Sequence, residues 1–505
     1  MLVSNLCMIK TYRNSKYCLL KFLKFRVFRY KSKILIVKCN NFFKNWSNRK
    51  TIIIMKSIQI VLLLFFVSVT SFAQDKKWTL KECINHAIKN NISIKQSELD
   101  LQTTAITKKD AIGNFLPTLN ASASHSWNIG LNQNITTGLL ENQTTQFTSA
   151  NLNANVDIFK GLQNVNQLRK ANLSIIASQY QLTKMQEDIA LNVANAYLQI
   201  LFNKENLKVQ KEQSVLDAKQ YDRTVQLVDA GNVPKGDLLD IQATKASGKQ
   251  RVIVAENTLM LSKLSLAQLL QIQDFQNFDV SEDDMPTMLS TILSESPETV
   301  IAKAKESRTE LKIAQANLAI AEKDISIAKG AYLPSLSAFY GFNTRASNSD
   351  GFDFVTGTIT SPKPIFTQFD TNKGQNFGLS LNIPIFNGFT VRNNVARSKI
   401  ALERSKLAKT QQELDIERNV FTAYTDTKAA KESYEAALQI EKARELAMQY
   451  AKDRYEIGMM NIFDYNQSQT AFVNAQSEVL RTKYDYIFRI KILEFYFGIP
   501  LIEKQ

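Results

Sequence analysis

The sequence predicts a mainly α-helical protein with a membrane-embedded β part, built from two tandem copies of one structural unit. Three observations support this prediction. Short segments recur at a long, nearly constant spacing, each copy has a long interval without Gly or Pro, and about ten-residue segments alternate apolar with Asn or Ser residues. The long intervals predict helices that need coiled-coil packing, and the alternation is typical of strands that span a membrane.

The segment from Met55 predicts a signal peptide over residues 55–73. Lys56 is followed by an apolar run, and Ser71-Phe72-Ala73 offers small residues at the positions that a signal peptidase reads. The run is too short to cross a bilayer as a helix, and a buried core helix is the alternative. We interpret residues 1–54 as a non-native extension upstream of the true start. A genuine basic extension is the alternative, which N-terminal sequencing of the mature protein would test.

The repeat is visible in matched short segments. Gly113–Leu119 (GNFLPTL) matches Gly330–Leu336 (GAYLPSL), and Ile158–Gly161 (IFKG) matches Ile385–Gly388 (IFNG). A period of more than 200 residues indicates a duplicated half of a domain rather than a solenoid of short repeats.

We therefore predict a first copy over 74–300 and a second over 301–499. The junctions between helix and strand should lie at Pro117, Gly161, Pro334 and Gly388.

Each copy should contain one very long helix, over 161–230 and 388–457. Between Gly161 and Gly231, and between Gly388 and Gly458, the chain has no Gly or Pro and is rich in residues that favour helix. A helix of this length reaches about 100 Å, although a break inside it is the alternative.

Gly231 and Gly458 end these intervals and predict turns. Return helices should follow over 237–272 and 464–497, with Asp237 and Asp464 as their N-caps. Shorter helices, about 92–113 and 309–329, should precede the two prolines.

Hairpins are predicted over 117–160 and 334–387, with polar loops at about 130–147 and 344–374. Their strands have one apolar face and, most clearly in copy one, one face of Asn and Ser. The apolar positions begin Leu119, Ala121, Ala123 in copy one and Leu336, Ala338, Tyr340 in copy two. The pattern is typical of a membrane barrel with a wet lumen, and a half-buried soluble sheet is the alternative.

Four strands cannot seal a membrane pore by themselves. An open sheet in lipid would leave the backbone groups of its edge strands unpaired. Identical chains should therefore share one barrel, with eight strands from two copies or twelve from three. The strand count does not decide between them.

The acidic segment from Asp274 to Pro297 interrupts the repeat. It contains Asp279, Glu282, Asp283 and Asp284. It is either a belt outside the helices that stiffens the join or meets a partner, or a solvated linker.

Composition argues against several other functions. The 505 residues carry a formal net charge of +15, but residues 1–54 hold 13 Lys and Arg and no acid, and Lys56 adds one more. The rest of the chain is nearly neutral, so we expect no nucleic-acid partner. Only Cys83 follows Met55, and His86 and His125 are the only histidines. We therefore expect no metal, no cofactor and no enzymatic activity.

The order of these elements resembles the TolC family of outer-membrane efflux proteins over about 78–499. Local matches are Trp78–Asn91, similar to the family's short first helix, and Arg454–Gly458 followed by Asp464, similar to its periplasmic turn. The resemblance implies a homotrimer in the cell outer membrane, surrounded by outer-membrane lipid. It would have a twelve-stranded β-barrel and a periplasmic α-barrel of long antiparallel coiled-coil helices.

The resemblance also implies a passive exit duct for efflux or type I secretion. Such a duct needs a periplasmic adaptor protein and an inner-membrane transporter. The alternative is a structural or adhesive coiled-coil protein of the periplasm without channel activity, and a peripheral hydrolase is the least supported reading.

Closure of the periplasmic mouth is the role that the resemblance implies for Tyr455 and Asp464. A basic residue of the family's turn falls on Met460 and a further acid on Gln467, so this chain departs from the family there. In copy one, Asp237 and Asp240 occupy the two acidic positions. Repeated around a symmetry axis, Asp237, Asp240 and Asp464 would form carboxylate rings that favour cations. The alternatives are N-capping by each Asp and packing of Tyr455 in a helix seam.

Overall fold

The computed structural model describes residues 77–133, 138–282, 291–353 and 355–499. The chain from Asp75 onward forms one compact unit, which is the part considered below. The predicted extension 1–54, the signal peptide 55–73, and Asp283 and Asp284 of the acidic segment lie outside the described residues.

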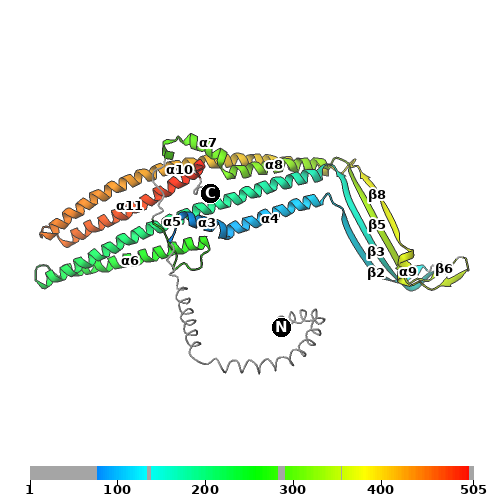
Figure 1. Ribbon diagram of the computed structural model, residues 1–505, viewed down its shortest axis with the longest axis horizontal. Helices are drawn as coiled ribbons and strands as arrows, with labels where there is room; N and C mark the ends of the chain where they lie inside the picture. Colours follow the sequence, from blue (N-terminus) through cyan, green and yellow to red (C-terminus); the bar gives the residue numbers. More distant parts are fainter. Residues whose placement is uncertain (1–76, 134–137, 283–290, 354, 500–505) are drawn as a thin grey trace, which may run out of the picture. The chain divides into compact units, whose positions relative to one another are not determined.

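The helices of the two copies correspond in length as well as in order (Figure 1). Copy one contains α3 (Leu80–Asn90), α4 (Ile92–Gly113), α5 (Gln163–Asp229) and α6 (Lys235–Leu270). Copy two contains α7 (Pro297–Ser307), α8 (Thr309–Gly330), α10 (Thr390–Glu456) and α11 (Ile462–Phe497). The paired helices have 11, 22, 67 and 36 residues in each copy.

The long helices α5 and α10 continue without a break over their 67 residues each. At 1.5 Å per residue, each spans about 100 Å. The alternative of a broken helix is therefore not observed. Each begins directly after a residue in the left-handed region, Leu162 and Phe389, which sharply redirects the chain from the sheet.

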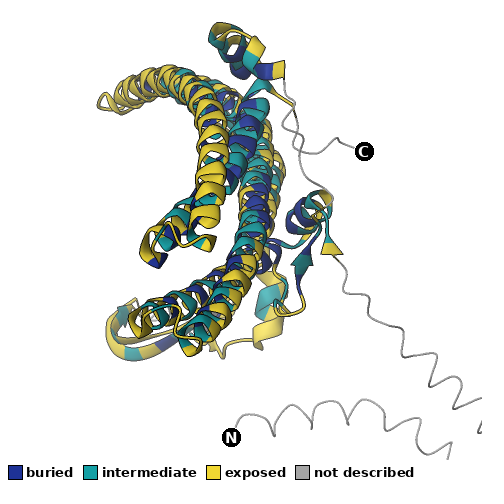
Figure 2. Cartoon of the chain, turned by 90° about the vertical axis from the view of Figure 1, so that its left-hand side faces the viewer, coloured by how far each residue is buried: buried dark blue, intermediate teal, exposed yellow. Residues whose placement is uncertain are grey.

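The helices lie side by side in one curved layer, with buried residues along their contacts (Figure 2). Nearer the sheet, neighbouring helices follow the order α4, α5, α8, α10. Toward the turns the order is α6, α5, α11, α10. The long helices thus continue through the layer, while α4 and α8 are replaced by α6 and α11.

The main sheet contains four antiparallel strands in the order β2-β3-β5-β8. They are β2 (Thr118–Gln133), β3 (Leu140–Lys160), β5 (Ser335–Ser347) and β8 (Gly374–Asn382). Ala123 pairs with Ala150, and Ala150 pairs with Thr344. The register therefore places the apolar positions of neighbouring strands on one face.

Three details of the hairpins differ from the sequence prediction. Most of the predicted loop 130–147 is strand, because β2 continues to Gln133 and β3 begins at Leu140. The hairpin predicted over 334–387 should keep its last strand to about residue 387, but β8 ends at Asn382. Pro384 offers no N–H for a ladder, which explains the early end. The predicted loop 344–374 is also partly ordered: β6 (Gly351–Asp353), β7 (Thr358–Thr360) and α9 (Ile365–Thr371) lie within it.

The largest hydrophobic core lies where α3, α5, α6 and α11 meet. Tyr197 of α5 is fully buried there, and its hydroxyl donates to the Ser281 carbonyl at 2.7 Å. At the equivalent place in copy two, the Tyr424 hydroxyl lies 3.4 Å from the Leu293 carbonyl. Each long helix thus contacts the segment that joins the copies through a matching tyrosine.

The described start of the acidic segment is attached to the helices. β1 (Lys77–Trp78) pairs with β4 (Asp279–Val280). The Asp279 carboxylate lies 2.9 Å from the ammonium groups of both Lys204 and Lys263. Burial alone would raise the pKa of Asp279, but the two lysines outweigh it and hold the pKa below its usual value. This part packs as a strap across α5 and α6 rather than as a solvated linker.

Candidate functional site

The two helical turns have the same backbone geometry. Gly231 and Gly458 have φ of 74° and 75°. In the first turn the Asn232 N–H donates to the Leu227 carbonyl at 2.8 Å, and in the second the Met459 N–H donates to the Arg454 carbonyl at 2.8 Å. These are Schellman C-caps, in which a left-handed residue lets the chain reverse. Glycine suits both positions because it has no Cβ to strain.

The return helices begin two residues earlier than the sequence suggested, so the N-cap prediction for Asp237 and Asp464 is wrong. Pro234 precedes α6 in an extended conformation, and Asp237 lies in the first turn of that helix. Asn461 caps α11 by accepting from the Asp464 N–H at 2.8 Å, and its amide donates to the Asp464 carboxylate at 2.9 Å. Both carboxylates still lie near the positive end of a helix dipole, and this interaction stabilises the helix.

Tyr455 packs in a helix seam. Its ring stacks on Tyr465 with centroids 5.1 Å apart and planes 10° apart. The pair belongs to a small core with Ile241 and Ala451, and Met460 packs against the same core. An apolar side chain at position 460 therefore extends this core where the family resemblance suggested a basic group.

The four candidate residues do not contact one another within one chain. Asp240 and Asp464 are exposed, and Asp237 and Tyr455 are half-buried. Among the described residues, no hydrogen bond or ion pair joins any two of them. If they act together, they must do so between copies of the chain.

Sequence reasoning missed a buried polar cluster that ties the turn region together. Asp217 of α5 is buried and accepts from Gln213 at 2.7 Å, from Arg251 of α6 at 3.3 Å and from Gln469 of α11 at 3.4 Å. A Cβ on Gly248 would overlap the Asp217 carboxylate. Glycine inside a helix often marks such a close approach, so Gly248 was the available signal.

Replacing Asp217 should loosen this junction. Asp217→Ala leaves Gln213 and Gln469 with unpaired buried amides, at a cost of about 1–3 kcal/mol. Asp222→Ala is the control, because Asp222 is exposed and its ion pair with Lys245 is long, at 3.9 Å. We expect thermal unfolding to show a clear loss for Asp217→Ala and almost none for Asp222→Ala. Equal losses would contradict a buried junction.

The charge of Asp217 gives this junction a pH dependence of known sign. Burial raises the pKa of Asp217, although the Gln213 hydrogen bond and the Arg251 charge act against it. A raised pKa means that the folded protein holds the proton of Asp217 more tightly than the unfolded chain does. The stability that Asp217 contributes to the fold is therefore complete below about pH 3.8 and is lost as pH rises through the folded pKa. Over that window the unfolding temperature of Asp217→Asn should improve relative to the parent.

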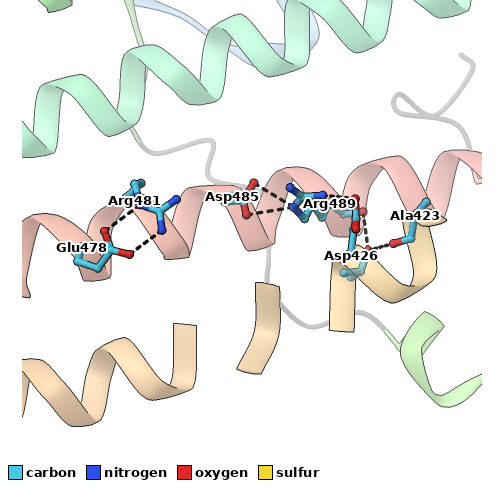
Figure 3. A network of polar contacts seen from close by, with 7 residues as sticks. Ala423, Asp426, Glu478, Arg481, Asp485 and Arg489 are labelled. Carbon is cyan, nitrogen blue, oxygen red and sulfur yellow. Dashed lines mark hydrogen bonds and ion pairs between the residues drawn. The ribbon is translucent and has the colours of Figure 1, made fainter. Parts of the chain in front are cut away.

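Further polar contacts join copy one to copy two and α10 to α11. Near the turns, Arg223 of α5 lies 3.3 Å from Glu456 of α10. Arg489 of α11 binds Asp485 at 3.0 Å and Asp426 of α10 at 2.6 Å (Figure 3). These groups are half-exposed, so each pair contributes at most about 1 kcal/mol and serves mainly to set helix register.

No helix within the described residues is both long and apolar enough to cross a membrane. The same part of the chain contains no group of three or more His, Cys, Asp or Glu side chains arranged to hold a metal ion.

A curved layer of long paired helices, continuous with a four-stranded sheet that has one apolar face, defines the subunit of an outer-membrane channel. Comparison with known proteins agrees. The family model described as outer membrane efflux protein matches residues 83–270 and 300–493. The chain belongs to this family, and it is an efflux channel of the cell outer membrane.

Individual relatives have low sequence identity to this chain, but the alignments cover most of their length. Outer membrane protein TolC of Vibrio cholerae is 25% identical over 320 residues, covering 62% of this chain and 68% of that protein. Outer membrane protein TolC of Escherichia coli is 22% identical over 445 residues, covering 86% and 84%. The CmeC outer membrane channel of Campylobacter jejuni matches in structure with a TM-score of 0.66 at 19% identity, covering 84% of this chain and 87% of that one. This family is one of channels rather than enzymes.

Proposed function

We propose that three copies of the chain form a passive exit duct, which a periplasmic adaptor and an inner-membrane transporter open at the end formed by the helical turns. The duct would serve a tripartite efflux or type I secretion system. The observation that carries the proposal is the open sheet: β2 and β8 are its edge strands, and each pairs on one side only within the sheet. Edge strands in lipid must be paired, so β8 of one copy would join β2 of the next.

The borders of the helical layer support the same ring. α4 contacts α5 on one side, and α10 contacts α8 and α11 at the opposite border. Both borders carry exposed apolar side chains at a seven-residue spacing, which suits a coiled-coil seam. They are Ile92, Leu99 and Ile106 on α4, and Ile400, Leu407, Leu414 and Phe421 on α10.

Three copies would give twelve strands, within the range of known outer-membrane barrels. The helices of the three chains would then surround one axis, with the two turns of each chain at the far mouth. Asp237, Asp240 and Asp464 lie in or near the first turns after the turn glycines, so each would form a carboxylate ring there. Packing of Tyr455 on Tyr465 would stabilise the closed mouth.

Recordings from purified protein in planar bilayers test the duct and its mouth together. We expect discrete single-channel conductance with a preference for cations. Asp237→Ala combined with Asp464→Ala should reduce that preference and weaken block by divalent cations, because two rings lose their charge. Lys406→Ala is a control for an exposed charge far from the turns.

Two outcomes would count against these proposals. Unchanged selectivity in the double variant would contradict the carboxylate rings while leaving the duct intact. A mature protein that stays monomeric without detergent and gives no conductance would contradict the duct, and it would favour the structural or adhesive coiled-coil protein.

A further inference from the structure

The segment after β7 folds back onto the sheet. The Thr344 hydroxyl of β5 donates to the Phe369 carbonyl of α9 at 2.7 Å. The Gln368 side chain accepts from the Ser347 N–H at 2.9 Å and donates to the Ser347 carbonyl at 2.8 Å. The Asn372 amide donates to the Arg345 carbonyl at 2.9 Å. These bonds attach α9 to the end of β5, so it is not a free loop.

The strand register decides on which face α9 lies. Side chains alternate along a strand, so Thr344 shares a face with Phe342 and Tyr340. Pairing of Thr344 with Ala150, and of Ala150 with Ala123, continues this face across β3 and β2. It is the apolar face of the sheet, opposite the Asn and Ser face.

The contact covers three strands of the same chain. A cavity of about 210 Å³ lies between α9 and the sheet, and its lining includes His125 of β2, Thr148 of β3 and Ala346 of β5. α9 therefore lies over the inner part of its own sheet rather than beyond the β8 edge. A neighbouring copy that pairs at β2 or β8 would leave the outer side of α9 uncovered.

α9 is attached at the outer end of the part of β5 that is long enough to cross a membrane. A membrane strand needs about 9–11 residues, and the part of β5 from Ser335 to Arg345 has this length, with α9 bound at its far end. On β2, Trp127 and Ile129 are exposed on the apolar face just beyond the His125 that α9 covers. Aromatic residues gather where strands leave the hydrocarbon region. His125, beneath α9, contacts Trp127 edge-on with centroids 4.3 Å apart.

We propose that α9 is an interfacial foot, a short helix that lies among the lipid headgroups of the outer leaflet and inserts Phe366 toward the acyl chains. The Phe366 side chain is 82% exposed, so α9 presents a large aromatic group to its surroundings, whereas Ile365 lines the cavity between α9 and the sheet. Lys363 precedes the helix and suits the headgroup level. The inference rests on the proposed barrel, whose apolar face continues into this surface.

Depth-dependent quenching tests the foot directly. Phe366→Cys would be labelled with the fluorophore NBD in the full-length protein and reconstituted into liposomes. Cys83 is buried, Cys7, Cys18 and Cys39 would be replaced by Ser, and the protein with these replacements but without Phe366→Cys gives the background. We expect a blue-shifted emission that lipids spin-labelled near the headgroup quench several-fold more than lipids labelled near the chain end.

Val355→Cys is the matched control, because Val355 is equally apolar and 94% exposed but lies in the turn between β6 and β7. Its label should emit as in water and be quenched by iodide. The same iodide-sensitive behaviour at Phe366 would overturn the interfacial foot.

A third position separates this result from failure of the barrel. Leu379 of β8 is exposed on the apolar face and pairs with Ala338, six residues before Thr344, so it lies well inside the membrane part of the sheet. A label on Leu379→Cys should be quenched most by lipids labelled near the chain end. Deep quenching at Leu379 without quenching at Phe366 would reject the foot alone, whereas no lipid quenching at either position would reject the membrane barrel as well.

Discussion

Gly161→Ala is expected to prevent the strand-to-helix junction of copy one from forming, whereas Gly388→Ala, at the matching junction of copy two, is expected to leave the fold of the single chain largely intact. Both glycines have left-handed φ, 54° and 60°. A Cβ on Gly161 would overlap the carbonyl oxygen of Gly330 at the end of α8, which is backbone and cannot turn aside. Within one chain, nothing lies within 4 Å of a Cβ added at Gly388, which stands at the border of the helical layer.

The expected sizes of the two effects differ clearly. Gly388→Ala adds only the strain of a left-handed residue, about 1–2 kcal/mol. Gly161→Ala adds a backbone clash to the same strain, and a total beyond about 4 kcal/mol places it among the most destabilising single substitutions. The measurements are the amount of protein recovered in the outer-membrane fraction and its thermal unfolding temperature. Similar losses for both variants would show that the two backbones can separate at little cost.

Removing Arg308 is expected to have the second large effect. Arg308 lies between α7 and α8 and is only 4% exposed. Its guanidinium binds Glu310 through two hydrogen bonds of 3.0 and 2.8 Å, lies 3.6 Å from Glu187 of α5, and stacks on Phe495 of α11 at 4.1 Å. Arg308→Met keeps much of the volume but leaves Glu310 and Glu187 without their cation. Breaking a buried ion pair in this way costs about 3–5 kcal/mol.

Two further variants separate the loss of the buried ion pairs from the loss of a surface charge and from the loss of guanidinium geometry. Lys305→Ala removes a half-exposed pair with Glu417 nearby and should cost at most about 1 kcal/mol. Arg308→Lys retains the charge but not the two-pronged geometry, so it should fall between the parent and Arg308→Met. Thermal unfolding ranks the variants, and an Arg308→Met protein as stable as the Lys305→Ala protein would contradict the buried cluster.

The same cluster predicts how acid acts. Burial alone would raise the pKa of Glu310, but the hydrogen bonds and charge of Arg308 outweigh it and lower the pKa. A lowered pKa stabilises the folded protein above the unfolded pKa of about 4.5, and this contribution is lost as pH falls through the folded value. Burial raises the pKa of Glu187, which opposes part of the effect. Acidification below about pH 4.5 should therefore destabilise the parent more than Arg308→Met.

Arg308 and Asn91 occupy matching positions of the two copies but make different contacts. Both separate two consecutive helices at matching positions of the copies, and both are buried. Asn91 caps α4 and donates to the Leu269 carbonyl at 3.0 Å, whereas Arg308 forms the ion cluster. The repeat indicated that the positions correspond, but the contacts of each depend on which helices surround it.

The sequence alone determined the long helices, the turn glycines and the apolar face of the sheet, because each depends on residues close together along the chain. The lack of Gly and Pro after Gly161 and Gly388 predicted two unbroken rods, and alternation predicted which side chains share a strand face. Only the tertiary structure brought Asp217 to Arg251 and Gln469, and laid α9 on β5. Those contacts join residues far apart in sequence, so they depend on how helices and strands align in space.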